Sequence, residues 1–249
     1  MPLRIPVSLT LGLLPPFLLC AWLGQWQLGR MAEKQALFSA FENAEQLDLA
    51  QAMVEEVAFA RVRVRGEFDR SAVFLLDNKI LDGRAGVHVL QLFRPEANPP
   101  ILVNRGWLPI SADRTELPAV ETPEANVDIQ GILSAPIEGG FRLGEPDVLA
   151  PPIKPQLITY LDLDRIAGAV GEPLSPWIIL LEAGDETGFA GRDWQPSVML
   201  PAQHGAYAAQ WFGLALAIAI TWTALAWRAS RKSPRRDQAS TGNHSDSPE

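Results

Sequence analysis

The chain has 249 residues, of which 47% are hydrophobic, and its formal net charge is −8 at neutral pH. Its mean hydropathy is close to zero because two membrane-like segments are averaged with a polar middle. Cys20 is the only cysteine. No disulfide can therefore form within the chain, and thiol-based copper carriers and disulfide exchangers are excluded.

Two long apolar segments frame the chain. Residues 207–227 form an uncharged run of 21 residues, and a helix of that length spans roughly 30 Å, the thickness of a bilayer core. Residues 5–26 form a second uncharged run, whose prolines are tolerated in membrane helices. This run is long for a signal peptide, and no A-x-A cleavage site follows it. We predict transmembrane helices at 5–26 and 204–227.

Basic residues near the helix ends predict the orientation. The segment 31–203 holds 14 basic and 26 acidic residues, whereas the tail 228–249 starts with a basic cluster. The cluster consists of Arg228, Arg231, Lys232, Arg235 and Arg236. Because basic loops stay in the cytoplasm, we expect both termini there. The domain 27–203 then lies in the periplasm or, in a mitochondrion, the intermembrane space. From residue 233 the tail is polar and predicted to be disordered.

The middle of the chain has the pattern of a β-rich domain. In residues 57–68, Ala60, Val62 and Val64 alternate with arginines, which is typical of a half-buried strand. Further strands are predicted at 71–78, 87–93, 101–110, 126–134, 176–182 and 196–200, and helices at 27–41, 47–54 and 162–171. Short sequential strands separated by turn signals favour a mainly antiparallel sheet or small barrel of α+β class.

The enzyme motifs that can be tested are missing from the sequence. It has no G-x-S-x-G elbow, P-loop, G-x-G-x-x-G or H-E-x-x-H. The three histidines, His88, His204 and His244, do not cluster with the other ligands that a zinc or copper site needs. We therefore expect a protein that is not an enzyme.

The most unusual residue is a histidine at the start of the second apolar helix. His204, Tyr207 and Trp211 share one helical face. One interpretation is an axial ligand of haem iron, because an iron porphyrin needs a neutral imidazole and an apolar wall. The alternative is an interfacial histidine among the aromatic residues that are enriched at that depth. Gln210 lies where a hydrogen-bond partner of the imidazole would be expected.

Small residues on the same helix predict a helix contact. Ala209, Gly213 and Ala217 form a small-xxx-small row, which lets another helix approach closely. The first helix of the same chain is one candidate partner, and a helix of a foreign membrane subunit is the other.

The segment ILVNRGWLP, residues 101–109, allows a structural and a functional interpretation. In the first, a buried strand runs into a turn where Gly106 supplies backbone freedom and Trp107 fills the core. In the second, Arg105 pairs with a carboxylate such as a haem propionate or an acidic partner. The first is favoured, because an arginine in a turn is usually solvated or paired internally.

Three motifs together resemble the Surfeit locus protein one family. They are WLGQWQLGRMAEK with Trp26 and Gln27, ILVNRGWLP with Asn104, Arg105, Gly106 and Trp107, and HGAYAAQWFGLAL, which begins at His204. Their order and spacing match the family, and the resemblance extends from about residue 10 to residue 228.

The resemblance implies an assembly factor for cytochrome c oxidase in the inner membrane. Some bacterial members of the family bind haem a through a histidine at the start of the second helix, and His204 occupies that position. The implied role is to hold or deliver haem a to the nascent catalytic subunit. Expected partners are that subunit, haem a synthase and membrane lipid, with no nucleic acid. The alternatives are a haem-free scaffold for the apo-subunit and a periplasmic ligand sensor that acts through a partner.

Overall fold

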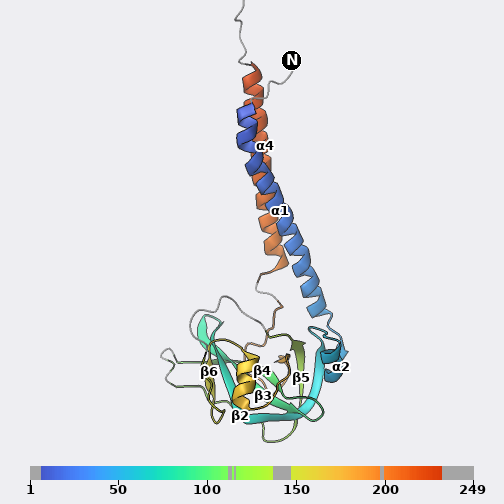
Figure 1. Ribbon diagram of the computed structural model, residues 1–249, viewed down its shortest axis with the longest axis vertical. Helices are drawn as coiled ribbons and strands as arrows, with labels where there is room; N and C mark the ends of the chain where they lie inside the picture. The colour runs from blue at the N-terminus through green and yellow to red at the C-terminus, as the bar shows by residue number, and fades with distance from the viewer. Residues whose placement is uncertain (1–6, 112–113, 115, 137–146, 197–198, 232–249) are drawn as a thin grey trace, which may run out of the picture. The chain divides into compact units, whose positions relative to one another are not determined.

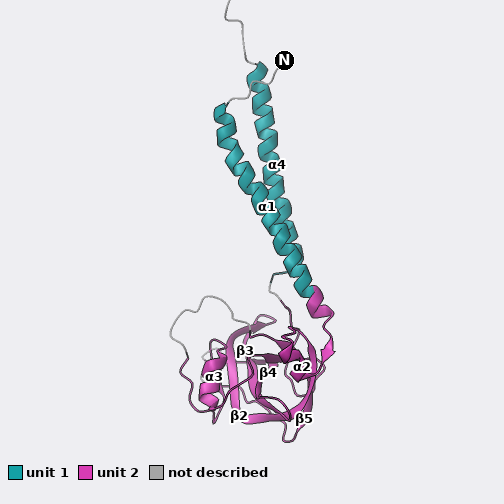
Figure 2. Cartoon of the chain, turned by 45° about the vertical axis from the view of Figure 1, so that its right-hand side comes forward, with its two compact units in different colours: residues 1–38, 197–249 teal, residues 39–196 magenta. Residues whose placement is uncertain are grey.

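The computed structural model describes residues 7–111, 114, 116–136, 147–196 and 199–231. The predicted disordered part of the tail lies outside these residues. The chain divides into two compact units, coloured separately in Figure 2. Residues 1–38 and 197–249 form the first, the helical unit, and residues 39–196 form the second, the β domain.

The helical unit consists of two long apolar helices, α1 (Val7–Glu42) and α4 (Pro201–Arg231), which lie side by side in Figures 1 and 2. Both have the length and composition needed to cross a membrane. The predicted pair of spans flanking an α+β domain is thereby confirmed. Pro15 and Pro16 lie inside α1 without ending it, and the helix predicted at 27–41 is its direct continuation.

The two helices pack through small residues, but not through the predicted row. The buried residues of α4 are His204, Ala208, Ala215 and Ala226, and those of α1 are Cys20 and Gly24. A Cβ atom at Gly24 would lie 2.8 Å from the ring of Phe212, so the close approach needs a glycine there. Of the two candidate partners of the row Ala209, Gly213 and Ala217, α1 does not cover it, because the row is exposed on a neighbouring face of α4.

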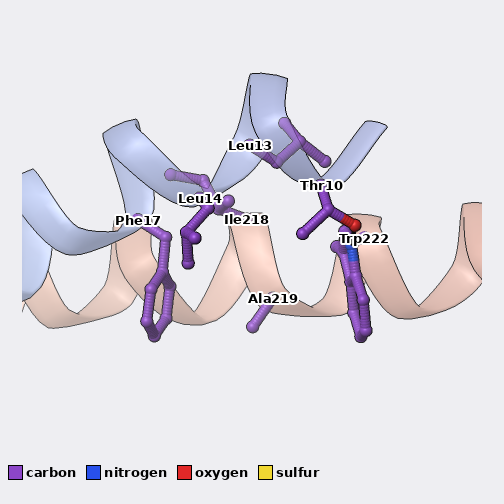
Figure 3. Close-up of a pocket in the computed structure, with 7 residues that line it drawn as sticks. All are labelled: Thr10, Leu13, Leu14, Phe17, Ile218, Ala219 and Trp222. Carbon is purple, nitrogen blue, oxygen red and sulfur yellow. Dashed lines mark hydrogen bonds between the residues drawn. The ribbon is translucent and has the colours of Figure 1, made fainter. Parts of the chain in front are cut away.

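A small apolar cavity opens between the helices near the start of α1 (Figure 3). Its volume is about 220 Å³, and it is lined by Thr10, Leu13, Leu14, Phe17, Ile218, Ala219 and Trp222. The indole Nε1 of Trp222 donates a hydrogen bond of 3.1 Å to Thr10 Oγ1 at its edge. Ile218 is 14 residues beyond His204 on α4, or about 21 Å along the helix axis. This cavity is therefore separate from the histidine.

The β domain contains seven strands and two short helices among its described residues. They are β1 (Gln46–Leu47), α2 (Leu49–Val54), β2 (Arg61–Leu81), β3 (Arg84–Pro95), β4 (Ile101–Pro109), β5 (Val127–Ser134), β6 (Gln156–Ile158), α3 (Leu163–Val170) and β7 (Ile178–Leu181). The strands predicted at 57–68 and 71–78 are one strand, β2, with an irregularity between Phe68 and Val73. Of the strand predicted at 196–200, residues 197 and 198 lie outside the described residues, and Met199 and Leu200 are not in a strand.

The sheet closes on itself in the order β2–β3–β4–β7–β5, because β5 pairs with β2 again. The pairs of β2 with β3 and β5, of β3 with β4, and of β5 with β7 are antiparallel. β4 and β7 pair in parallel, as do β1 and β6 with β2. The predicted mainly antiparallel sheet of α+β class is confirmed, with parallel pairs that alternation alone cannot reveal.

The closed sheet buries side chains on both faces. One cluster includes Ile101 and Val103 of β4 together with Leu49 of α2, and we call its side the α2 face. The other cluster includes Leu102 of β4 together with Ile166 of α3, and we call its side the α3 face. Successive residues of a strand point to opposite faces, so two buried faces require near-continuous apolar runs.

Gly106 interrupts β4 with a conformation that other residues adopt only at a cost. Its φ is +109°, and a Cβ atom would lie 2.6 Å from the carbonyl oxygen of Ala190. The segment 189–190 comes this close because Trp107 N donates to Ala190 O at 2.7 Å and Phe189 N donates to Arg105 O at 2.6 Å. Because residue 106 has no side chain, the segment 189–190 near the end of the β domain can pair with β4.

We predict that Gly106→Ala lowers the free energy of unfolding of the β domain by at least about 2 kcal/mol, since positive φ and a backbone clash add up. Gly83→Ala is the matched control, because Gly83 also has positive φ but no atom within 4 Å of its Cβ position. Denaturant unfolding of the full chain measures both. Equal losses for the two variants would contradict the close approach.

Candidate functional site

His204 lies in the first turn of α4 and is buried, with 6% of its surface exposed. Its Nδ1 atom is 2.8 Å from Oε1 of Gln27 on α1. An amide oxygen only accepts hydrogen bonds. The proton of the imidazole is therefore on Nδ1, and this N–H donates a hydrogen bond to Gln27 Oε1. Gln210, which the sequence suggested as the partner, is exposed on another side of α4. That expectation is wrong, because the partner comes from the other helix.

The second imidazole nitrogen of His204 has no partner among the residues that the structure describes. Its Nε2 atom is buried and makes no hydrogen bond to any described residue. With the proton on Nδ1, Nε2 holds an unshared lone pair, and a buried acceptor without a donor costs about 1–3 kcal/mol. Histidines that ligate metals have this arrangement, with one nitrogen on the metal and the other N–H donated to an oxygen. The chemistry of this site therefore fits an iron ligand.

Aromatic side chains extend along α4 from the histidine. Tyr207, one turn further, is 47% exposed, and Trp211, two turns further, is half-buried. Only His204 among the three is buried against α1, so Tyr207 lies at the edge of the face that the sequence predicted them to share. Trp26, beside Gln27 on α1, is 49% exposed. These residues leave aromatic surface accessible near the imidazole.

Arg105 is held entirely inside the β domain, with 2% of its surface exposed. Its guanidinium hydrogen-bonds to Thr187 O, Gln91 Oε1 and Glu121 O, and lies 4.7 Å from the ring centres of Phe68 and Phe189. Burial lowers the pKa of the guanidinium to about 10, although the charge of Asp185 opposes this shift. These contacts favour the structural interpretation of Arg105, since acceptors within the β domain already engage its guanidinium.

Asn104 of the same motif orients His88 of β3. Asn104 Oδ1 accepts a hydrogen bond of 3.2 Å from Gly106 N, so its Nδ2 faces Nδ1 of His88, 3.3 Å away. The proton of His88 is then on Nε2. Burial, and secondarily the charge of Lys79, lower the pKa of the imidazole to about 4. His88 is neutral, and its unprotonated nitrogen, Nδ1, already accepts the hydrogen bond from Asn104 Nδ2.

The described residues contain no group of three or more His, Cys, Asp or Glu side chains that could hold a metal ion. A haem iron needs only one protein nitrogen on its proximal side. Of the two described histidines, His204 has a free lone pair and His88 does not. The sequence had no signal for Gln27 as the orienting residue beyond its place in the first motif.

We predict that the β domain loses stability as the pH falls from about 6.5 to 4. The unfolded imidazole of His88 binds a proton near its ordinary pKa of 6.5, whereas the folded one does so only near 4. The unfolded state therefore binds more protons in this window, and the contribution of His88 is about 2 kcal/mol between pH 7 and pH 5. His88→Phe should flatten that slope in denaturant unfolding. An NMR titration that puts the His88 pKa near 6.5 would contradict this.

Comparison with known proteins shows sequence similarity to one family. The sequence model of the SURF1 family matches residues 14–216, which include all of the β domain and His204. Surfeit locus protein 1 of Gallus gallus is 27% identical over 238 residues, covering 85% of this chain and 73% of the relative. A SURF1-like protein of Caenorhabditis briggsae is 27% identical over 232 residues (80% and 69%). One of Rickettsia bellii (strain RML369-C) is 22% identical over 227 residues (85% and 88%).

Proposed function

This chain belongs to the SURF1 family of cytochrome c oxidase assembly factors, and on that premise we propose that it holds haem a beside the nascent catalytic subunit. Membership in this family favours an assembly factor over an enzyme. Haem a is then a cargo that the protein binds and passes on. The chain's own task is to bind it, orient it and keep water away.

The observation that carries this proposal is the free Nε2 atom of His204. Iron accepts an axial imidazole nitrogen, and Nε2 is buried and without a hydrogen-bond partner among the described residues. Gln27 fixes the tautomer and the ring orientation of His204 by accepting a hydrogen bond from its Nδ1–H. The accessible rings of Tyr207 and Trp211 supply the apolar wall against which a macrocycle packs.

We further propose that α1 and α4 cross the inner membrane with both ends in the cytoplasm. Arg228 and Arg231 in the last turn of α4 favour the cytoplasmic side for that end. His204 then lies at the outer end of α4, and the β domain is periplasmic, or in the intermembrane space of a mitochondrion. The cargo would be held at the outer surface of the membrane.

The partners in this proposal are the catalytic subunit as acceptor and haem a synthase as donor. The row of Ala209, Gly213 and Ala217 is exposed on α4, and a Cβ atom at Gly213 would meet nothing within 4 Å. Small residues let a foreign transmembrane helix approach closely. The same row also favours the second candidate function, a scaffold that stabilises the apo-subunit through helix packing and carries no haem.

The proposal predicts about one haem a per chain when the protein is purified in detergent from cells that make haem a. His204→Ala should lose most of it, because the axial nitrogen is removed. His88→Phe, the control, should keep it. A reduced-minus-oxidised spectrum of each purified protein measures the haem, and circular dichroism verifies that each variant is folded.

The alternatives give other results in the same experiment. Two results together would favour the scaffold. The purified wild-type protein would contain no haem, and deletion of its gene would still selectively lower the oxidase activity of the cells. Haem retained by folded His204→Ala would place the ligand elsewhere. A sensor would instead alter transcription when the gene is deleted.

The orienting role of Gln27 can be tested separately. Gln27→Leu should weaken haem binding by roughly 10- to 100-fold, as is typical when the hydrogen-bond partner of a ligating histidine is lost. Gln25→Leu is the matched control, since Gln25 lies on the same helix but is exposed. Haem titration of both apoproteins measures the affinities. Equal affinities would show that Gln27 does not act on the ligand.

A further inference from the structure

The β domain contains a second cavity that the haem proposal does not use. Its volume is about 460 Å³, within the range of small-molecule sites. It opens on the α3 face, where Leu90, Ile178 and Leu180 belong to the apolar cluster. Polar residues also line it, among them Asp77, Lys79, His88 and Asn104.

Two irregularities of the sheet meet at this cavity. Leu76 pairs with His88 and Lys79 with Gly86, so β2 has one residue more than β3 between these pairs. On the other side of β3, His88 pairs with Trp107 and Leu90 with Asn104, so β4 also has one extra residue. Such bulges re-aim side chains and occur often beside binding sites. His88 is the residue of β3 that faces both of them.

The bulge in β4 fixes which hydrogen-bonding group His88 presents. Gly106 N donates to Asn104 Oδ1, and Asn104 Nδ2 donates to His88 Nδ1. The imidazole is therefore neutral with its proton on Nε2, and no described residue accepts that proton. The ring is held edge-on to Trp194, with 5.5 Å between ring centres. The cavity is thus given an oriented N–H donor.

The bulge in β2 brings a positive charge to the same cavity. Lys79 is half-buried and forms no ion pair with any described residue. Burial lowers the pKa of its ammonium, and its charge acts on His88. The nearby carboxylate of Asp77 is already engaged, because it pairs with Arg114 at 2.7 Å and accepts a hydrogen bond from Asn78 N. One cation therefore remains uncompensated.

We propose that this cavity binds a small organic monocarboxylate with an apolar body. Lys79 and the Nε2–H of His88 hold the carboxylate, and Leu90, Leu180 and Trp194 contact the body. A single ammonium beside a neutral donor balances one negative charge, whereas a phosphate dianion would need a second cation or a helix N-terminus. The proposal is independent of the haem site, because every residue it uses lies within the β domain.

The test uses the full chain in lipid nanodiscs and 4-(4-fluorophenyl)butyrate as the probe, followed by ¹⁹F NMR. The wild type should bind the carboxylate saturably. The corresponding alcohol and amine, which carry the same apolar body, should only partition into lipid. Lys79→Met should weaken carboxylate binding at least about tenfold, because a charge-assisted hydrogen bond is lost. His88→Phe should weaken it less.

Lys154→Met is the matched control, because Lys154 is exposed and does not line the cavity. It should bind like the wild type. No saturable binding by the wild type, equal binding of the alcohol or amine, or unchanged affinity in Lys79→Met would each overturn the proposal. The comparison of the three probes on the wild type decides the matter even where a variant does not fold.

Discussion

The β domain depends on one long strand, β2, whose backbone pairs with four other strands. β1 and β5 pair with its beginning, β3 pairs with it from Gly66 to Leu81, and β6 pairs with Phe74, Leu75 and Leu76. Because β5 returns to it, β2 both opens and closes the sheet. A strand of 21 residues cannot remain regular while it bends around such a sheet. Its irregularities are therefore a consequence of closure.

The positions of these irregularities determine where chemistry can occur in the β domain. The extra residue between Leu76 and Lys79 lies in the part of β2 that pairs with His88, and Lys79 and His88 line the same cavity. The extra residue of β4 lies beside Asn104, which also lines this cavity, and Gly106 tolerates the positive φ there. Bulges in adjacent strand pairs thus bring Lys79, His88 and Asn104 to one cavity.

Two buried polar residues, Arg105 and His204, differ in how completely their polar atoms are hydrogen-bonded. The guanidinium of Arg105 meets three acceptors and two aromatic rings, so the burial of its charge is compensated within the domain. The imidazole of His204 is compensated on one side only, by Gln27. A buried group with one partner missing is an unusual feature in a folded protein. It is the reason that His204, and not Arg105, is a candidate for binding a cargo.

The sequence by itself determined most of the elements and their type. Uncharged runs long enough to span a bilayer predicted α1 and α4, and alternation predicted most strands, because both patterns depend on residues close together in the chain. It also drew attention to His204 and to residues 101–109. It suggested Gln210, six residues away, as the partner of His204, which was wrong, and it left open whether α1 or a foreign helix covers the row that begins at Ala209.

Only the tertiary structure decided which distant residues meet. Gln27 and His204 are 177 residues apart in the chain, and Arg105 and Thr187 are 82 apart. The face of α4 that packs on α1 depends on how closely Gly24 lets the ring of Phe212 approach. The periodicity of apolar residues in the sequence does not predict this distance. Local patterns set the conformation of a segment, whereas the hydrogen bonds of its buried polar groups depend on where closure and packing bring the other segments.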